Sequence, residues 1–240
     1  GGKGERRKPI TDNTPKPMIE FHGKPFLEYI INQLREQGIE EVILLVGYMA
    51  HKIEDYFGDG ASHGVKIKYS HGPTEYETGS RLLSAIGLFN AEFLLLYCDN
   101  YCPMNLELMT SEYEKSQCKS LITVYNNHDM FTRSNVIVDS AGYVQLYDPS
   151  RQMDNLNGVE IGYSITKREI IEQIPNNNVR FEHYIYPLLA AEGSLFAYQT
   201  DHRYYSIGSH DRLQNTEAFL KPQRAIISVS YTHLTLPTKA

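Results

Sequence analysis

The sequence lacks the features that mark several large classes of protein. Its apolar runs stay well short of the roughly 18 residues that a membrane-spanning helix needs, so we expect no membrane partner. The three cysteines are an odd number without disulfide-like spacing, which suits a reducing cytoplasm. Basic residues are not in excess, because 23 Lys and Arg against 29 Asp and Glu give a formal net charge of −6. A nucleic-acid partner is therefore not expected either, since such proteins are usually basic.

Apolar residues alternate between strand and helix patterns in the first half of the chain. Nearly continuous apolar runs at 41–47 and 92–100 predict strands that are covered on both faces. Residues 24–38 place apolar side chains on one helical stripe that stops at a glycine, and residues 105–117 predict another helix. A further strand is predicted at 120–125. This rhythm predicts an α/β fold of the Rossmann-like kind, with a mostly parallel sheet and helices on both faces.

The rhythm changes beyond residue 130. An alternating pattern at 134–148, with a turn at 141–142, predicts a hairpin, and residues 158–165 predict one more strand. Helices are expected at 168–174 and 182–193. We interpret this half as a β-rich insertion and lid beside the sheet rather than as an independent domain.

The segment GGKGERRKPITDNTPKPM, residues 1–18, carries a surplus of cations in a chain that is acidic overall. Gly1, Gly2 and Gly4 let backbone N–H groups approach an anion closely, because no Cβ stands in the way. Arg6 follows the glycines, and Lys16 lies between two prolines that hold it on stiff, extended chain. The segment has neither the GK[ST] of a Walker loop nor the third glycine of a dinucleotide fingerprint. We therefore expect a phosphate-binding loop of another kind, with a solvated basic loop as the alternative.

This segment resembles the signature GGxGTRLxPLTxxxPKPM of the sugar-phosphate nucleotidyltransferases, also called nucleotide-sugar pyrophosphorylases. The match is gapless, with Glu5 and Arg7 as departures, and a weaker likeness continues to about residue 220. The resemblance implies the nucleotide-diphospho-sugar transferase fold, with the insertion binding the sugar. It also implies a reaction in which a sugar 1-phosphate attacks the α-phosphate of a nucleoside triphosphate and releases pyrophosphate. In the family, Arg6 would serve the departing pyrophosphate and Lys16 the phosphate where transfer occurs, which suits their chemistry.

Asp99 directly follows the buried run that starts at residue 92. It is therefore expected at the carboxyl edge of the sheet, where open α/β folds bind ligands. The resemblance implies that this aspartate is catalytic and binds Mg²⁺, the expected cofactor. The family usually has the motif NGD at this point. This chain has Tyr97-Cys98-Asp99, so only the aspartate of the motif is retained. The alternative is that Asp99 caps the next turn together with Asn100.

A second metal-binding aspartate is usual in the family where this chain has Ser206. A hydroxyl is a far poorer Mg²⁺ ligand than a carboxylate. Three outcomes stay open: Asp99 and the phosphates suffice, another acid such as Asp201 substitutes, or activity is weak.

The remaining walls of the site rest on weaker signals. Thr78 and Gly79, in EYETGSRLLSA, resemble the family's base-contacting turn, and the resemblance implies that they bring backbone to the nucleotide base. The EKP of the family's sugar-phosphate pocket is missing, and Arg151 is the nearest cation. Glu160 is the candidate for sugar hydroxyls, because planar carboxylates suit paired OH donors.

The two ends of the chain resemble cut ends. Family members carry an apolar first strand before the glycines, normally central in the sheet, so this strand is expected to be truncated. Residues 1–222 are assigned to the nucleotidyltransferase domain. Residues 202–220 resemble a subgroup fused to a haloacid-dehalogenase-type phosphatase, so 223–227 are expected to begin a truncated phosphatase domain. Residues 228–240 resemble a translated sequencing adapter and are left out of fold prediction.

Phosphatase fusions of this kind suggest GTP and a manno-heptose 1-phosphate as substrates, by analogy rather than from a site. The expected enzyme is cytoplasmic and supplies precursors of lipopolysaccharide or capsule. The alternatives are thymidylyl or cytidylyl transfer to a hexose 1-phosphate, and a nucleotide-sugar-binding domain without catalysis. Whether the protein forms a homo-oligomer stays open.

Overall fold

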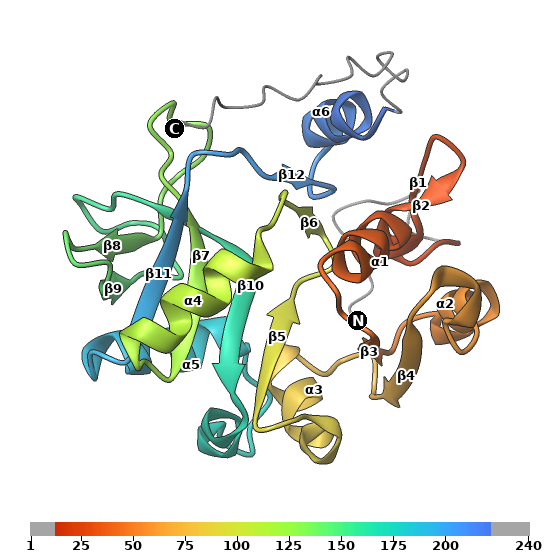
Figure 1. The fold of residues 1–240 in the computed structure, drawn as a ribbon, viewed down its shortest axis with the longest axis horizontal. Coiled ribbons are helices and arrows are strands. Elements are labelled where there is room, and N and C mark those ends of the chain that lie inside the picture. The colour runs from red at the N-terminus through yellow and green to blue at the C-terminus, as the bar shows by residue number, and fades with distance from the viewer. Residues whose placement is uncertain (1–12, 222–240) are drawn as a thin grey trace, which may run out of the picture.

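The computed structural model describes residues 13–221, and the statements below concern this part of the chain. Figure 1 shows a central layer of strands with helices around it. This arrangement confirms the predicted α/β class. The expected phosphatase start at 223–227 and the adapter-like tail at 228–240 lie outside the described residues.

The larger part of the central layer is a four-stranded sheet with the order β11-β7-β10-β5. Strand β11 is parallel to β7, whereas β10 runs antiparallel to both of its neighbours. The sheet is thus less parallel than predicted, because β7 reaches β10 through the hairpin insertion and not through the helical crossover that parallel neighbours need. The bounds are β5 Glu92–Leu96, β7 Ser120–Tyr125, β10 Val159–Lys167 and β11 Leu195–Thr200.

A second piece of sheet pairs β3 (Glu41–Val46) in parallel with β4 (Lys66–His71). Among the described residues, no backbone pairing joins β3 to β5. An apolar cavity of about 450 Å³ lies between these two strands, and successive residues of both line it. One further extended strand would fill a gap between two unpaired strand edges. The expected central strand before Gly1 stays a prediction with which this gap is compatible.

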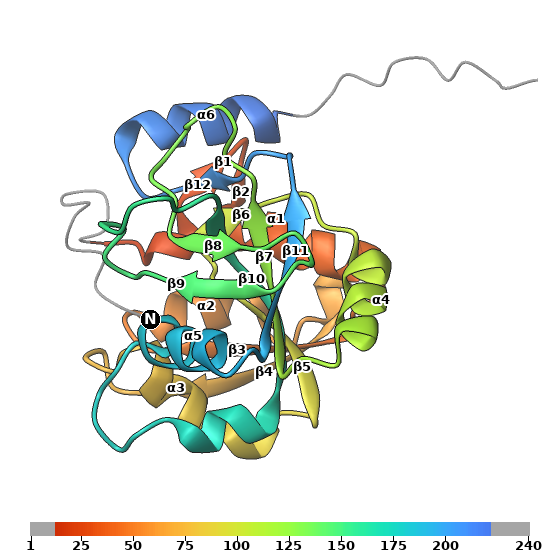
Figure 2. The same cartoon turned by 90° about the vertical axis from the view of Figure 1, so that its left-hand side faces the viewer.

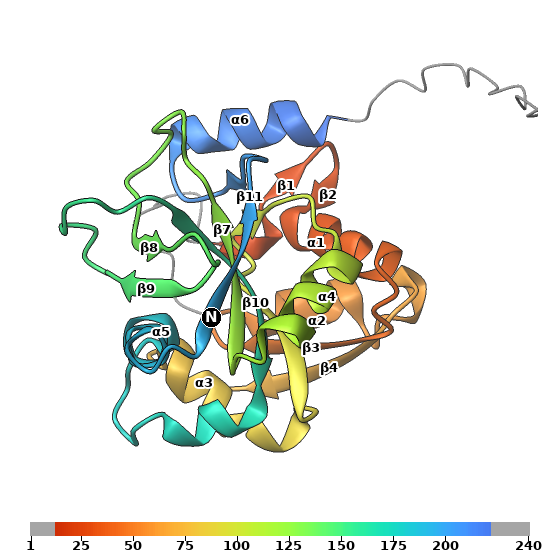
Figure 3. The same cartoon turned by 60° about the vertical axis from the view of Figure 1, so that its left-hand side comes forward.

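Helices cover both faces of the four-stranded sheet (Figures 2 and 3). On one face, α4 (Leu106–Ser116) packs Met109 and Tyr113 against β7 and β10. On the other face, α5 (Phe181–Ala191) and α3 (Thr78–Ser84) share a core with the hairpin insertion. Two further helices, α1 (Phe26–Glu36) and α2 (Ala50–Phe57), pack against β3 and β4. The helices predicted at 24–38, 105–117 and 182–193 are thus confirmed within a few residues.

The predicted hairpin is also present, as β8 (Val136–Val138) and β9 (Val144–Tyr147). Its turn is closed by Asp139, whose carboxylate accepts hydrogen bonds from two turn N–H groups, and Gly142 takes a φ of 93°. The helix predicted at 168–174 is instead a 3-10 helix, η6 (Arg168–Gln173). No helix among the described residues has the length and apolar character needed to cross a bilayer. The remaining short elements are η3 Lys16–Met18, β1 Glu20–Phe21, β2 Lys24–Pro25, η4 Ala61–His63, η5 Ile86–Leu88, β6 Asn100–Tyr101, β12 Tyr205–Ser206 and the helix α6 His210–Leu220.

Candidate active site

The centre of the candidate site is an ion pair between Lys16 and Asp99. Lys16 begins η3 directly after Pro15, and Asp99 follows the end of β5. The Lys16 Nζ atom lies 2.6 Å from Asp99 Oδ2, so two residues 83 positions apart meet at one edge of the sheet. A phosphate at this edge would meet a cation and a carboxylate side by side. The rest of the predicted phosphate loop lies outside the described residues: Gly1, Gly2, Gly4 and Arg6.

Asp99 is the residue at this edge of the sheet that could hold a metal ion. Ser206 lies beside Asp99, because β12 pairs Ser206 with Asn100 and the Ile207 N–H donates to the Asp99 carbonyl. The Ser206 hydroxyl is buried and accepts a hydrogen bond from Arg212 Nη1 at 3.2 Å. Among residues 13–221, no group of three or more His, Cys, Asp or Glu side chains could hold a metal ion. Since Mg²⁺ often binds through one carboxylate together with phosphates and water, the fit rests on Asp99.

Asp201, the other acid considered for the metal, has partners elsewhere. Asn126 Nδ2 donates to Asp201 Oδ1 at 2.7 Å, and His128 Nε2 lies 3.7 Å from the same oxygen. Both partners follow β7, on a different segment from Asp99. The contacts of Asp201 therefore give no support to the substitution that the sequence left open.

The turn at Thr78 and Gly79 is held by the segment that leads into α5. The Gly79 N–H donates to the Val179 carbonyl at 3.0 Å, and a Cβ at Gly79 would lie 2.7 Å from that oxygen. Thr78 Oγ1 accepts a hydrogen bond from the Phe181 N–H at 2.8 Å. Gly79 is therefore needed for close packing against this segment. Its N–H already has a protein partner in this arrangement, so a nucleotide base would have to be read by other groups of the turn.

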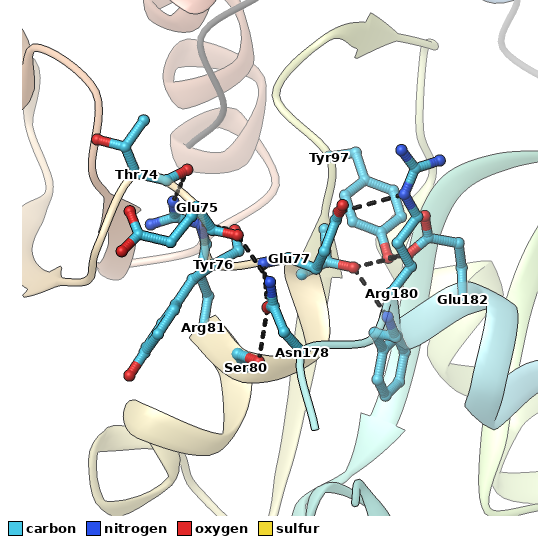
Figure 4. Close-up of polar contacts among 12 residues, drawn as sticks. Thr74, Glu75, Tyr76, Glu77, Ser80, Arg81, Tyr97, Asn178, Arg180 and Glu182 are labelled. Atoms are coloured by element: carbon cyan, nitrogen blue, oxygen red, sulfur yellow. Dashed lines mark hydrogen bonds and ion pairs between the residues drawn. The ribbon is translucent and has the colours of Figure 1, made fainter. Parts of the chain in front are cut away.

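The buried guanidinium of Arg81 fixes the chain just before this turn, and sequence analysis did not single it out. It donates to the carbonyls of Tyr76, Pro73 and Thr74 at 2.8–3.3 Å, and Figure 4 shows Arg81 beside Thr74 and Tyr76. It also donates to the Val46 carbonyl at 3.0 Å, which ties the turn to the end of β3. Burial lowers the pKa of Arg81. A charged residue on the apolar stripe of α3 was the signal available in the sequence.

Glu160 lies at a bulge in β10. The register of β10 against β7 shifts between Glu160 and Ser164, and Gly162 takes a φ of 89° there. The Glu160 carboxylate accepts hydrogen bonds from the Gly162 N–H and from Tyr147 OH. Burial raises the pKa of Glu160 to about 7, although these hydrogen bonds and the charge of Arg151 oppose the rise. A carboxyl that is partly protonated at neutral pH can both donate to and accept from sugar hydroxyls.

Arg151, the predicted sugar-phosphate residue, lies in the loop after β9 with a left-handed backbone, φ 57°. Its guanidinium donates to the Arg133 carbonyl. Burial raises the pKa values of Glu160 and Tyr147, and the nearby charge of Arg151 partly opposes both rises. The structure thus brings the two predicted sugar-side residues, Arg151 and Glu160, to the same part of the molecule.

Glu182, a second residue that the sequence did not single out, connects the two halves of the site. Its Oε2 atom accepts hydrogen bonds from Tyr97 OH and from Thr78 Oγ1, both at 2.8 Å (Figure 4). Burial raises the pKa of Tyr97 well above its ordinary value, so the phenol stays a neutral donor. In the sequence, an acid in the first turn of a helix is sufficiently explained by the helix dipole, which is why Glu182 carried no signal.

Several solved structures align with this chain over most of its length. HddC from Yersinia pseudotuberculosis, complexed with GMP-PN, aligns with a TM-score of 0.77 at 24% identity over 91% of this chain and 96% of that chain. A UDP-glucose pyrophosphorylase complexed with UDP-glucose aligns with a TM-score of 0.77 at 21% identity over 91% and 95%. At these identities the likeness defines the fold, which is the nucleotide-diphospho-sugar transferase fold.

The chain belongs to the nucleotidyl transferase family, whose profile matches residues 1–135. A UTP--glucose-1-phosphate uridylyltransferase of Synechocystis is 30% identical over 73% of this chain and 49% of its own length. A D-glycero-alpha-D-manno-heptose 1-phosphate guanylyltransferase of Campylobacter jejuni is 35% identical over 57% of this chain and 60% of its own length. The chain spans about half the length of the curated relatives that it matches.

Proposed function

We propose that this chain carries the catalytic domain of a sugar-1-phosphate nucleotidyltransferase. The pairing of Lys16 with Asp99, at the edge of the sheet that follows the signature loop, is the observation that carries the proposal. In the reaction, an oxygen of the sugar 1-phosphate attacks the α-phosphorus of a nucleoside triphosphate. The bond from that phosphorus to the bridging oxygen breaks, and pyrophosphate leaves with the electron pair.

Lys16 and Arg6 have distinct electrostatic roles in this proposal. The Lys16 ammonium stabilises the charge that develops on the α-phosphate oxygens, because nucleotidyl transfer depends mainly on positioning and on charge neutralisation. The Arg6 guanidinium, by its planar fork, holds two oxygens of the departing pyrophosphate. Mg²⁺ is the proposed cofactor: Asp99 would hold it, and the bound ion would neutralise phosphate charge.

The sugar-side wall orients the nucleophile. The buried Glu160 carboxyl would bind sugar hydroxyls, and Arg151 would face the sugar phosphate. The turn at Thr78 and Gly79 would lie against the nucleotide. Holding both substrates in one geometry converts the transfer into an effectively unimolecular step.

For the substrates, we propose GTP and a manno-heptose 1-phosphate in a cytoplasmic enzyme that feeds lipopolysaccharide or capsule assembly. The heptose 1-phosphate guanylyltransferase relative and the GMP-PN complex of HddC support this choice. Uridylyl- and mannose-specific guanylyltransferase relatives keep other substrates open. A fused phosphatase domain and a homo-oligomer belong to the same proposal.

The direct test is pyrophosphate release by the purified chain, measured with each of GTP, UTP, CTP and dTTP against heptose, mannose and glucose 1-phosphates in the presence of Mg²⁺. We expect transfer with at least one pair, and the highest kcat/KM with GTP and a manno-heptose 1-phosphate. Transfer confined to another pair would replace the proposed substrates and keep the reaction class. Tight binding of a nucleotide-sugar without release of pyrophosphate from any pair would favour the second candidate function, a binding domain. The observation that favours a binding domain is the hydrogen bond from the Arg212 guanidinium to Ser206, at the position where a metal-binding acid was expected.

A further inference from the structure

We propose that Glu182 is a positioning residue, which sets the turn at Thr78 and Gly79 at a fixed distance from the strand end that carries Asp99. The proposal rests on the proposed function, because it assigns that turn to the nucleotide and Asp99 to the reaction centre. Glu182 itself contacts no reacting group. Its role is to hold the two halves of the site in one geometry.

The first support is the pair of hydroxyl groups on one carboxylate oxygen. Thr78 Oγ1 and Tyr97 OH each lie 2.8 Å from Glu182 Oε2. Thr78 begins α3, whereas Tyr97 follows β5 and precedes Asp99 by two residues. Hydrogen bonds to an ionised acceptor are roughly twice as strong as neutral ones. A single half-buried carboxylate therefore joins the nucleotide turn to the strand end.

The second support is that the segment 178–182 and the turn cap each other's helices. Neither α3 nor α5 has a side-chain cap from its own preceding residue. Instead, Asn178 Oδ1 accepts from the Glu77 N–H at 2.7 Å and from Ser80 Oγ at 2.9 Å (Figure 4). The Thr78 hydroxyl in turn accepts from the Phe181 N–H. Helix N-termini leave N–H groups without intrahelical partners, so each segment satisfies donors of the other.

We call residues 178–182, together with their contacts to residues 75–80, the clasp. An ion pair and a further hydrogen bond, from the side-chain amide of Asn178, complete it. Arg180 Nε lies 3.2 Å from Glu77 Oε2, and Asn178 Nδ2 donates to the Glu75 carbonyl at 2.8 Å. Arg81 fixes the other end of the turn to β3. Within the clasp, Glu182 differs from its neighbours because one of its partners, Tyr97, lies just after β5, on the segment that leads to Asp99.

This position has a catalytic consequence. When two substrates are held by different parts of a site, a displacement of about 1 Å can cost roughly 10²-fold in rate. Loss of Glu182 would let the turn move relative to Asp99 while the fold, held by its separate cores, remains. The effect should therefore be on kcat and on the KM for the triphosphate, with little change in melting temperature.

The test compares Glu182→Ala, Glu182→Gln, Thr78→Val and Tyr97→Phe in the full chain. The matched control is Tyr113→Phe, which removes another tyrosine–glutamate hydrogen bond, 3.0 Å from Tyr113 OH to Glu92 Oε1, at the opposite end of β5. Two readouts are used for each variant. One is hydrogen–deuterium exchange at residues 74–80 without substrate, and the other is kcat and KM for both substrates.

We expect Glu182→Ala to raise exchange at 74–80 and to lower kcat by about 10²-fold. Thr78→Val and Tyr97→Phe should each cost about tenfold and, combined, no more than Glu182→Ala, because they act through one carboxylate. Glu182→Gln should restore most of the activity, since its carbonyl oxygen still accepts hydrogen bonds. Tyr113→Phe should behave like the parent in both readouts.

The proposal is overturned if Glu182→Ala leaves exchange at 74–80 unchanged, or if kcat and both KM values stay within twofold. Equal losses in Tyr113→Phe would also overturn it. If Glu182→Ala fails to fold, Glu182→Gln and the two single-hydroxyl variants decide instead. A parent chain that transfers no nucleotide refutes the proposed function, whereas the exchange experiment still decides whether Glu182 fixes the turn.

Discussion

Arg212 Nη1 donates a hydrogen bond to Ser206 Oγ across the junction of β12 and α6, at 3.2 Å. The same guanidinium donates to Thr132 Oγ1 and lies over the rings of Phe131 and Tyr204. The place where a second metal-binding acid was expected therefore contains a hydroxyl that is bonded to a cation. This relationship changes the expected outcome of restoring the acid.

Ser206→Asp alone should leave the Mg²⁺ requirement of nucleotidyl transfer within about twofold of the parent. The new carboxylate would pair with Arg212, because an opposite charge at hydrogen-bond distance holds it away from the ion. In combination with Arg212→Gln, the carboxylate is released, and the Mg²⁺ concentration at half-maximal rate should fall several-fold. Binding of Mn²⁺, followed by its electron paramagnetic resonance signal, measures the same change without turnover. A fall in the Ser206→Asp single variant would show that Arg212 does not control this position.

Lys16→Ala should reduce turnover by roughly 10²- to 10³-fold, the usual cost of losing one preorganised electrostatic donor. The affinity for the triphosphate should change far less, because Lys16 is assigned to charge that develops during transfer. Pyrophosphate release and calorimetric titration with a non-hydrolysable triphosphate separate the two quantities. Turnover within about threefold of the parent would remove Lys16 from the proposed mechanism.

Asp99→Asn should abolish transfer and leave the free energy of unfolding within about 1 kcal/mol, since part-exposed ion pairs contribute little to stability. The matched control is Lys119→Ala, which breaks the Lys119–Glu192 pair, of similar length and exposure, at the far end of β7. It should affect neither quantity. Near-parental activity of Asp99→Asn at saturating Mg²⁺ would mean that Asp99 is a cap and not a ligand.

Glu160 predicts a pH dependence of stability. Burial raises its pKa from 4.5 to about 7 in the folded chain, so the folded state binds more protons than the unfolded state between these values. The contribution of Glu160 is therefore fully present below about pH 4.5, falls as the pH rises to about 7, and is constant above. The size of the loss is on the order of 3 kcal/mol.

Urea denaturation of the parent and of Glu160→Gln at several pH values measures this contribution, because glutamine removes the titration and keeps the volume. The difference between the two proteins should shift in favour of Glu160→Gln as the pH rises from 5 to 7. A difference that is constant over this range would show that Glu160 does not carry a raised pKa.

Local patterns predicted the elements better than the contacts between them. The strands at 41–47 and 92–100 could be predicted because a nearly continuous apolar run is typical of a strand inside a parallel or mixed sheet. The direction of β10 was not visible, since an isolated strand carries no signal for which neighbour it joins. Asp99 could be placed because it directly follows an apolar run that was predicted to be a strand.

The contacts that complete the site depend on tertiary packing. Glu182 meets Thr78 across 104 positions and Tyr97 across 85, and neither distance is encoded in a local pattern. Arg212 lies only six positions from Ser206, yet their contact depends on how α6 packs over β12. Gly79 was singled out as a backbone contact to the nucleotide base, which stays a prediction, and the sequence could not show that Val179 is the protein group that approaches it.

The gap between β3 and β5 leads to the last prediction, which concerns stability. Two strand edges without partners in the described sheet, and an apolar cavity of about 450 Å³ between them, should make the chain of residues 1–240 prone to aggregation and its thermal unfolding broad. Pro15, Lys16 and Pro17 line the same cavity. A segment of about five β-branched residues added before Gly1 should occupy the gap and pair with both β3 and β5.

Such an extension should raise the melting temperature by about 10 °C. A paired, buried strand adds several kcal/mol to the free energy of unfolding, and 1 kcal/mol corresponds to roughly 2–4 °C in a domain of this size. A Gly-Ser extension of equal length is the control, since it adds the same chain without apolar side chains. Differential scanning calorimetry and the fraction of monomer after heating measure the effect. Equal melting temperatures for the apolar and the Gly-Ser extensions, or a sharp cooperative transition in the chain without either, would show that the gap is not a place for a strand.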